Sequence, residues 1–138
     1  MQVRIDDIEM AIEFVSSSMS DSEAYIDVHT GEIHYVGDLV DEPVPTDIFE
    51  NKKYICLPSK VDLDLGKSVA LDFVRNNIPE KIDVTYDIFS RKGAYSKFKN
   101  LLASLDQLDN WYEYEQDALR RAALDWCLEN RIDVSIGT

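Results

Sequence analysis

The chain has 138 residues, of which 45% are hydrophobic, and a formal net charge of −13 at pH 7. This length suits one domain, predicted over residues 1–138, and the apolar content excludes a disordered chain. No apolar run approaches the ~20 residues that a membrane-spanning helix needs, so we expect no membrane association. The first residues turn acidic at once and lack the apolar segment of a signal peptide, which favours a cytoplasmic protein.

The negative charge is concentrated in the first third of the chain. Residues 5–51 contain thirteen Asp and Glu and no Lys or Arg, whereas residues 52–138 contain thirteen basic and fourteen acidic residues. Such a field repels nucleic acid and favours basic partners. We therefore expect another protein, basic in charge, as the partner. The alternative is an acidic surface that only keeps a small protein soluble.

The N-terminal segment predicts an amphipathic helix over about residues 5–16. Ile5, Ile8, Ile12 and Val15 recur at helical spacing, and acidic residues fill the opposite face. Residues 19–22 are typical of a loop.

A β-hairpin follows, formed by residues 24–28 and 33–36. Gly31 can take the positive φ that a tight connection requires. Pairing Val28 with Ile33 would place the apolar side chains on one face and set Asp27 opposite His34 on the other.

Beyond the hairpin, the chain alternates loop, strand and helix signals. Residues 38–51 are acidic and contain two prolines, which indicates an exposed loop. Residues 53–58 predict a third strand, and Asp62 is a plausible N-cap of the next helix. Pro79 suits the first position of another helix, which ends at Ser90.

Two further helices complete the chain. An apolar stripe begins at Ala94, directly after Gly93, and the last helix begins near Asp106 or Asp109 and ends at Asn130. In the last helix Tyr112, Leu119 and Trp126 recur seven residues apart in the predicted apolar stripe, and Trp111 and Trp126 are predicted to be core residues rather than part of a ligand site. The segregation of strands and helices predicts an α+β fold, with a small antiparallel sheet of a hairpin plus a third strand, about five helices, and a helical C-terminal half.

The turn between the helices before and after Gly93 is the first candidate site. Free N–H groups at a helix start, with cations around them, can hold a phosphate, and an aromatic ring can stack on a base. The motif has no nucleotide-binding fingerprint, and the alternative is an interhelical turn with solvated lysines. The candidate binding residues are Arg91, Lys92, Gly93, Tyr95, Lys97 and Lys99.

The hairpin is the second candidate site. Asp27 and His34 could ligate a metal or pair as a base and its orienting group, but a zinc site needs three or four converging ligands. The alternative is a cross-strand pair on an exposed face. Cys56 and Cys127 stand alone among apolar residues and are predicted to be buried free thiols. Neither a catalytic signature nor a cofactor motif is present, so no cofactor is expected.

Several runs of the sequence resemble the bacterial uncharacterised protein family 0158. They are KGAYSKFKNLL at 92–102, WYEY at 111–114, ALDWCLEN at 123–130, DVHTGEI at 27–33 and LPS at 57–59. The resemblance implies a small cytoplasmic bacterial protein and no transferable activity. Members often carry Gly-Ala-Phe followed by two basic residues, and here Tyr95 and Ser96 replace the Phe and the first basic residue.

The sequence thus favours a non-enzymatic module that binds a macromolecule. The acidic stretch 38–50 would face a basic protein. Nucleic-acid or phosphate binding through the turn 91–99 is one alternative, and a metal-dependent enzyme using Asp27 and His34 is the other.

Overall fold

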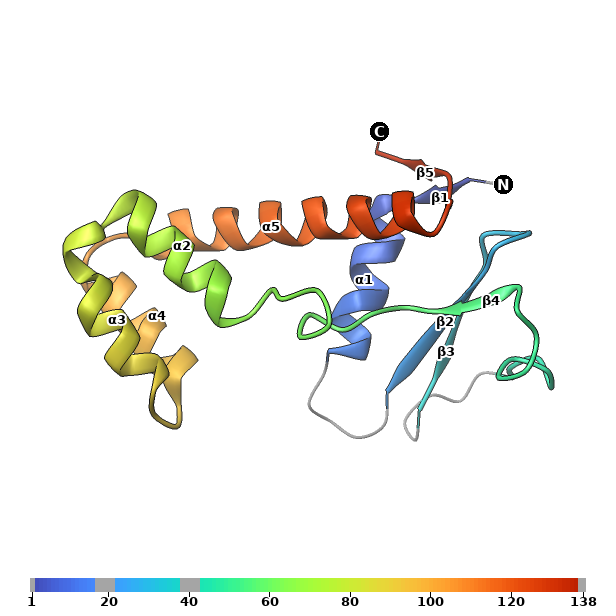
Figure 1. Cartoon of the computed structure of the whole chain (residues 1–138), viewed down its shortest axis with the longest axis horizontal. Helices are drawn as coiled ribbons and strands as arrows, with labels where there is room; N and C mark the ends of the chain where they lie inside the picture. Colours follow the sequence, from blue (N-terminus) through green and yellow to red (C-terminus); the bar gives the residue numbers. More distant parts are fainter. Residues whose placement is uncertain (1, 17–21, 38–42, 137–138) are drawn as a thin grey trace. The chain divides into compact units, whose positions relative to one another are not determined.

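The structure is a computed structural model that describes residues 2–16, 22–37 and 43–136. It has the predicted α+β fold with a helical C-terminal half (Figure 1). The predicted loop at 19–22 and the acidic residues 38–42 lie wholly or largely outside the described residues. In chain order the elements are β1 (Val3–Arg4), α1 (Ile5–Val15), β2 (Glu23–Asp27), β3 (Ile33–Val36), β4 (Tyr54–Cys56), α2 (Lys67–Asn77), a 3₁₀-helix (Pro79–Lys81), α3 (Ile82–Phe89), α4 (Ala94–Ser104), α5 (Leu108–Glu129) and β5 (Val134–Ser135).

The chain divides into two compact units. Residues 1–63 and 120–138 form the first, named here the terminal unit, and residues 64–119 form the second, the central unit. This division does not test the prediction of a single domain over residues 1–138, which stays a prediction.

The two units differ in net charge. The terminal unit has seventeen acidic and seven basic residues, a net of −10, and the central unit has ten and seven, a net of −3.

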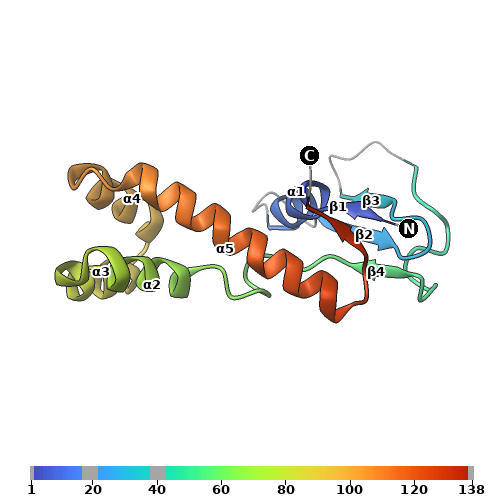
Figure 2. The ribbon, with the colours of Figure 1, turned by 90° about the horizontal axis from the view of Figure 1, so that it is seen from above.

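The terminal unit contains a three-stranded antiparallel sheet in the order β3-β2-β4 (Figures 1 and 2). The hairpin of β2 and β3 and the third strand β4 confirm the predicted sheet. A second pairing, which the sequence did not indicate, joins β1 and β5 in parallel through Val3 with Val134 and Arg4 with Ser135. These strands have two residues each, which is too short for an alternating pattern to be recognised.

One face of the three-stranded sheet packs against α1. Ala24 and Ile26 of β2 are fully buried there, as are Ile8 and Ile12 of α1. The Tyr35 ring meets Phe14 edge-on at 4.9 Å between centroids. Burial of about 25 cal/mol for each Å² of apolar surface makes this layer the main source of stability in the terminal unit.

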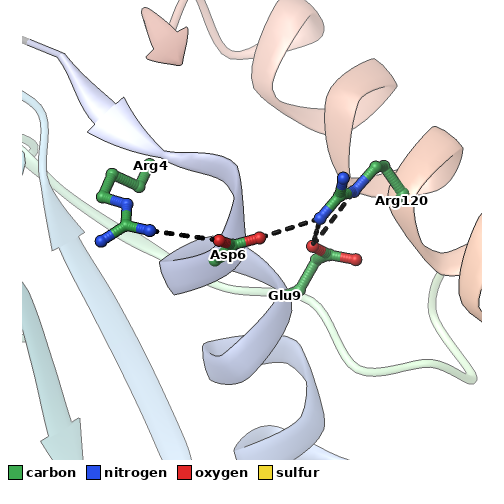
Figure 3. A network of polar contacts seen from close by, with 4 residues as sticks. All are labelled: Arg4, Asp6, Glu9 and Arg120. Carbon is green, nitrogen blue, oxygen red and sulfur yellow. Dashed lines mark hydrogen bonds and ion pairs between the residues drawn. The ribbon is translucent and has the colours of Figure 1, made fainter. Parts of the chain in front are cut away.

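A polar network joins α1 to the last turns of α5 within the terminal unit (Figure 3). The Arg120 guanidinium donates to Asp6 Oδ1 at 2.8 Å and to Glu9 Oε1 at 2.9 Å. Arg4 donates to the other oxygen of Asp6 at 3.3 Å. Glu9 is buried, so its charge requires a close cation to offset the loss of solvation.

The core of the central unit is aromatic. Trp111 meets Phe98 at 5.1 Å and Phe73 at 5.5 Å between centroids, in the edge-on geometry that aromatic pairs prefer. All three rings are fully buried, together with Val74 and Leu102. The Trp111 indole N–H has no hydrogen-bond partner among the described residues. The prediction that Trp111 is a core residue is therefore confirmed.

The hairpin has a different register from the one predicted. Ile33 pairs with Ile26 rather than with Val28, and His34 pairs with Tyr25 rather than with Asp27. The connection is longer than expected because Asp27 accepts hydrogen bonds within it. Gly31 takes a φ of 80°, as predicted.

Two expectations about the helices were wrong. Asp62 does not begin α2, because its side chain accepts from the Ser59 N–H while the Ser59 hydroxyl accepts from the Asp62 N–H. This local pair closes a turn, and the helix begins at Lys67. In α5 the buried stripe runs through Trp111 and Leu119, and Tyr112 is exposed.

Replacing Gly93 by alanine should destabilise the central unit by about 1 kcal/mol, because Gly93 has a φ of 72°. A Cβ at this position would meet no atom within 4 Å, so the cost is conformational rather than steric. Gly93→Asn should cost less, since asparagine tolerates the left-handed region. Urea unfolding followed by circular dichroism measures both, and equal stabilities of the wild type and Gly93→Ala would contradict the explanation.

Candidate functional site

The sheet face that points away from α1 carries the polar and aromatic residues, and we name it the outer face. The strand register places His34, Tyr25 and Cys56 in a row across β3, β2 and β4, with Tyr54 opposite Asp27. Side chains alternate between the faces of a strand, so the outer face is fixed once the opposite residues are buried under α1. Its remaining members on β2 and β3 are Glu23 and Val36.

Phe49 is the most prominent apolar side chain over this face. Its ring meets Tyr25 edge-on at 5.5 Å, yet 66% of the residue is exposed. The turn that presents it is tightly held. Ile48 is buried, the Ile48 N–H donates to the Pro45 carbonyl at 3.2 Å, and the Asn51 N–H donates to the Asp47 carbonyl at 2.9 Å. An exposed aromatic ring on a preorganised turn is a good anchor for a partner.

Three carboxylates lie near this ring along the chain or on its neighbour Tyr25. Asp47 and Glu50 flank it in sequence, and Glu23 accepts a hydrogen bond of 2.9 Å from the Tyr25 hydroxyl. Burial, and then the contact with Glu23, raises the pKa of Tyr25. Tyr25 therefore stays a neutral donor at physiological pH and leaves the negative charge on Glu23.

Asp27 is the best-ordered carboxylate of the outer face. Only 5% of it is exposed, and its Oδ1 accepts from the N–H groups of His29 at 2.8 Å and Thr30 at 3.3 Å. The Asp27 carbonyl also accepts from the Gly31 N–H. Burial pushes the pKa of Asp27 upward, but these backbone donors and the charge of Lys53 outweigh it and hold the pKa below its usual range. Asp27 is therefore ionised and fixed in position.

The two predicted hairpin residues share the outer face but are not a cross-strand pair. His34 pairs with Tyr25, lies 3.9 Å from Glu32 and meets the Tyr54 ring at 5.8 Å. Within the part of the chain that the structure describes, no three His, Cys, Asp or Glu side chains gather as metal ligands.

The two cysteines differ in environment. Cys127 is buried, as predicted, and burial raises its pKa to about 11. The prediction for Cys56 was wrong, because Cys56 lies on an edge strand and is exposed. Its thiol pKa is nevertheless raised, first by desolvation and then by the charge of Glu23. Both groups are therefore protonated thiols at neutral pH.

The basic turn between α3 and α4 lies on the surface of the central unit. All six of its predicted binding residues are exposed, including Tyr95 at 42%. Arg91 pairs with Asp87 at 3.2 Å, and the Lys99 ammonium lies 5.7 Å above the Tyr112 ring. Burial, and then the charge of Glu115, raises the pKa of Tyr95. The turn thus offers cations and an aromatic ring, with a carboxylate close by.

Sequence reasoning found Asp27 and His34 but missed Phe49, Tyr25 and Tyr54. Phe49 lies in a segment that reads as a loop, where no periodicity marks a functional side chain. The only available signal was a single aromatic residue between Asp47 and Glu50. Strand alternation already places Tyr25 on the same face as Asp27, whereas Tyr54 could be assigned to the outer face only from the observed pairing with β2.

These features define a small α+β protein in which an acidic sheet face presents an exposed aromatic ring. The chain belongs to the uncharacterised protein family UPF0158, whose family model matches residues 3–137. It is similar to the UPF0158 protein PA5073 of Pseudomonas aeruginosa, with 22% identity over 135 residues, which cover 96% of this chain and 85% of that protein. No solved structure matches the chain significantly. Among the described residues, no helix is both long and apolar enough to cross a membrane.

Replacing Asp27 by alanine should destabilise the terminal unit by about 1–3 kcal/mol, because two backbone donors and a nearby cation lose their acceptor. The folded-state pKa of Asp27 is lowered, so its contribution is present above the unfolded pKa of about 3.9 and is lost as the pH falls through the folded value. Urea unfolding at neutral pH and near pH 3 measures the difference. Glu32→Ala, in the same connection but exposed, is the control and should change stability by less than about 0.5 kcal/mol.

Proposed function

We propose that this protein is a non-enzymatic binding module that recognises a basic segment of another protein through the outer face of its terminal unit. The exposure of the Phe49 ring is the observation on which the proposal rests. The edge-on contact with Tyr25 covers only part of the Phe49 ring, and a partner that buried the exposed two-thirds would gain the hydrophobic contribution that the free protein does not use.

Charge supports a basic partner rather than an acidic one. The terminal unit has a net charge of −10, and no lysine or arginine stands between Arg4 and Lys52 in the sequence. Glu23, Asp47 and Glu50 make no ion pair with a lysine or arginine among the described residues. Unpaired carboxylates around an apolar anchor complement a segment that alternates cations with apolar side chains, and they accelerate its association.

The probe for this function is a fluorescent peptide of lysines interleaved with leucines, titrated with the protein and followed by anisotropy. Phe49→Ala should weaken binding about tenfold or more, as removal of an anchor residue does. Val61→Ala is the matched control, because Val61 is 85% exposed on the same unit and lies outside the outer face; it should leave the affinity unchanged.

Two further measurements, a salt titration and a second peptide, test the same proposal. Raising the salt concentration should weaken binding because it screens the carboxylates. A peptide with glycine in place of leucine should bind less tightly and should not distinguish Phe49→Ala from the wild type. Equal affinity of Phe49→Ala and wild type for the leucine peptide, or binding that ignores salt, would contradict the proposal.

A second candidate function is nucleic-acid or phosphate binding at the basic turn. One observation favours it: residues 88–105 contain four basic residues and no acidic residue, and all four are exposed. Tyr95 adds a ring on which a base can stack. The overall charge of −13 opposes this role, since it removes long-range attraction to a polyanion.

The double substitution Lys97→Glu with Lys99→Glu tests this second candidate against a labelled single-stranded oligonucleotide. If the turn binds, the double variant should lose measurable affinity while its circular dichroism spectrum stays unchanged. Lys52→Glu with Lys67→Glu makes the same charge change at two exposed positions elsewhere and should retain binding. Binding that survives in the Lys97 and Lys99 variant would rule the turn out.

A further inference from the structure

The chain places one of its own cations on the outer face. The Lys53 ammonium lies 3.6 Å from Asp27 Oδ2 and 5.0 Å from the centroid of the Tyr54 ring. An ordered carboxylate beside an aromatic face is the arrangement that proteins use to hold ammonium and guanidinium groups. We name Asp27 and Tyr54 together the cation cradle.

Asp27 and Tyr54, the two residues of the cradle, are held in place by contacts that do not involve Lys53. Oδ1 of Asp27 is fixed by the His29 and Thr30 N–H groups, which leaves Oδ2 as the oxygen that faces the cation. The Tyr54 ring is supported from the side by the His34 ring at 5.8 Å. Glu32 lies 3.9 Å from His34, between Oε2 and Nε2, and adds negative charge on this side. The cradle would therefore keep its shape and its sign if Lys53 left.

The Lys53 main chain is fixed by hydrogen bonds, but its ammonium makes only an ion pair with Asp27. A charge-assisted hydrogen bond between an ammonium and a carboxylate measures about 2.7–2.9 Å, so a separation of 3.6 Å is an ion pair without a hydrogen bond. Its side chain is 32% exposed, and it belongs to the short segment that links the Phe49 turn to β4. A cation that approaches more closely could take its place with a gain in contact.

We propose that the cation cradle is the subsite for one lysine or arginine side chain of the basic partner, and that Lys53 occupies it in the free protein and is displaced on binding. This inference rests on the proposed function, because it assigns a recognition element to the same outer face. Phe49 supplies the apolar anchor, and the cradle supplies the position at which the partner must carry a cation.

Lys53→Met tests displacement directly. It removes the competing cation but keeps an unbranched side chain that is only one atom shorter, so the lysine–leucine peptide should bind about two- to fivefold more tightly, as expected for a partly exposed cation–aromatic contact. Any loss of positive charge near the peptide gives some gain through long-range attraction. Lys52→Met therefore serves as the matched control, because it removes the neighbouring, exposed charge without emptying the cradle.

The prediction is that Lys53→Met binds the peptide more tightly than Lys52→Met does, and that adding Asp27→Asn to Lys53→Met cancels this gain. Equal affinities of the two methionine variants would overturn the assignment of the cradle as a subsite for a cation of the partner. Because Phe49→Ala and salt report on the outer face as a whole, such a result would leave the proposed function standing. Absence of peptide binding by the wild type and by Lys53→Met would overturn both.

A second measurement does not depend on substitution. In the free protein, the ε-methylene protons of Lys53 lie near the Tyr54 ring and should show a ring-current shift in a ¹³C-resolved NMR spectrum, with the Lys53→Met spectrum giving the assignment. Saturation with the peptide should move this signal towards the position of a solvated lysine. A signal that stays in place while the peptide binds would overturn the displacement.

Discussion

The Asp27 carboxylate is the group on which the hairpin and its outer face depend. Its Oδ1 accepts hydrogen bonds from the N–H groups of His29 and Thr30 in the connection between β2 and β3. Its Oδ2 faces Lys53, which directly precedes β4. One side chain of the central strand β2 therefore contacts the chain segments that lead into both neighbouring strands, β3 and β4. Because the carboxylate is nearly buried, its charge is stabilised by these backbone donors and by a cation beside Oδ2. The fold consequently requires a fixed negative charge at the place where the proposed partner would bring a positive one.

This constraint explains why the hairpin could be predicted in outline but not in detail. The alternation of Tyr25, Ile26 and Asp27 identified the strand and its two faces, and Gly31 marked the connection. The register moved by two residues because the Asp27 side chain accepts from the His29 and Thr30 N–H groups, so the connection includes Val28, which was predicted to pair with Ile33. A shift by two residues preserves which side chains share a face, whereas a shift by one would have exchanged them. The assignment of faces was thus robust, and the choice of cross-strand partners was not.

In the helices too, features that follow from the periodic spacing of apolar residues were predicted correctly, and features that depend on local side-chain contacts were not. Apolar spacing predicted the boundaries of α1 to within one residue. The start of α2 was predicted wrongly, because Asp62 has a closer partner in Ser59, and a side chain engaged in its own turn cannot cap a helix. In α5, Trp111 and Tyr112 are adjacent, and only the packing of Phe73 and Phe98 decides which ring is buried. Phe49 was out of reach for a related reason, since its exposure depends on the hydrogen bonds of its own turn.

The electrostatics of the terminal unit connect its stability to the proposed function. Arg120 pairs with Asp6 and Glu9 of α1, and Lys60 pairs with Glu13 of the same helix. Lys53 pairs with Asp27. Among the described residues, Glu23, Asp47 and Glu50 have no lysine or arginine partner, and like charges on one surface repel each other and lower the stability of the compact state. In the proposed complex, cations of the partner would remove this repulsion. The same charge that weakens the free protein would then strengthen the bound one.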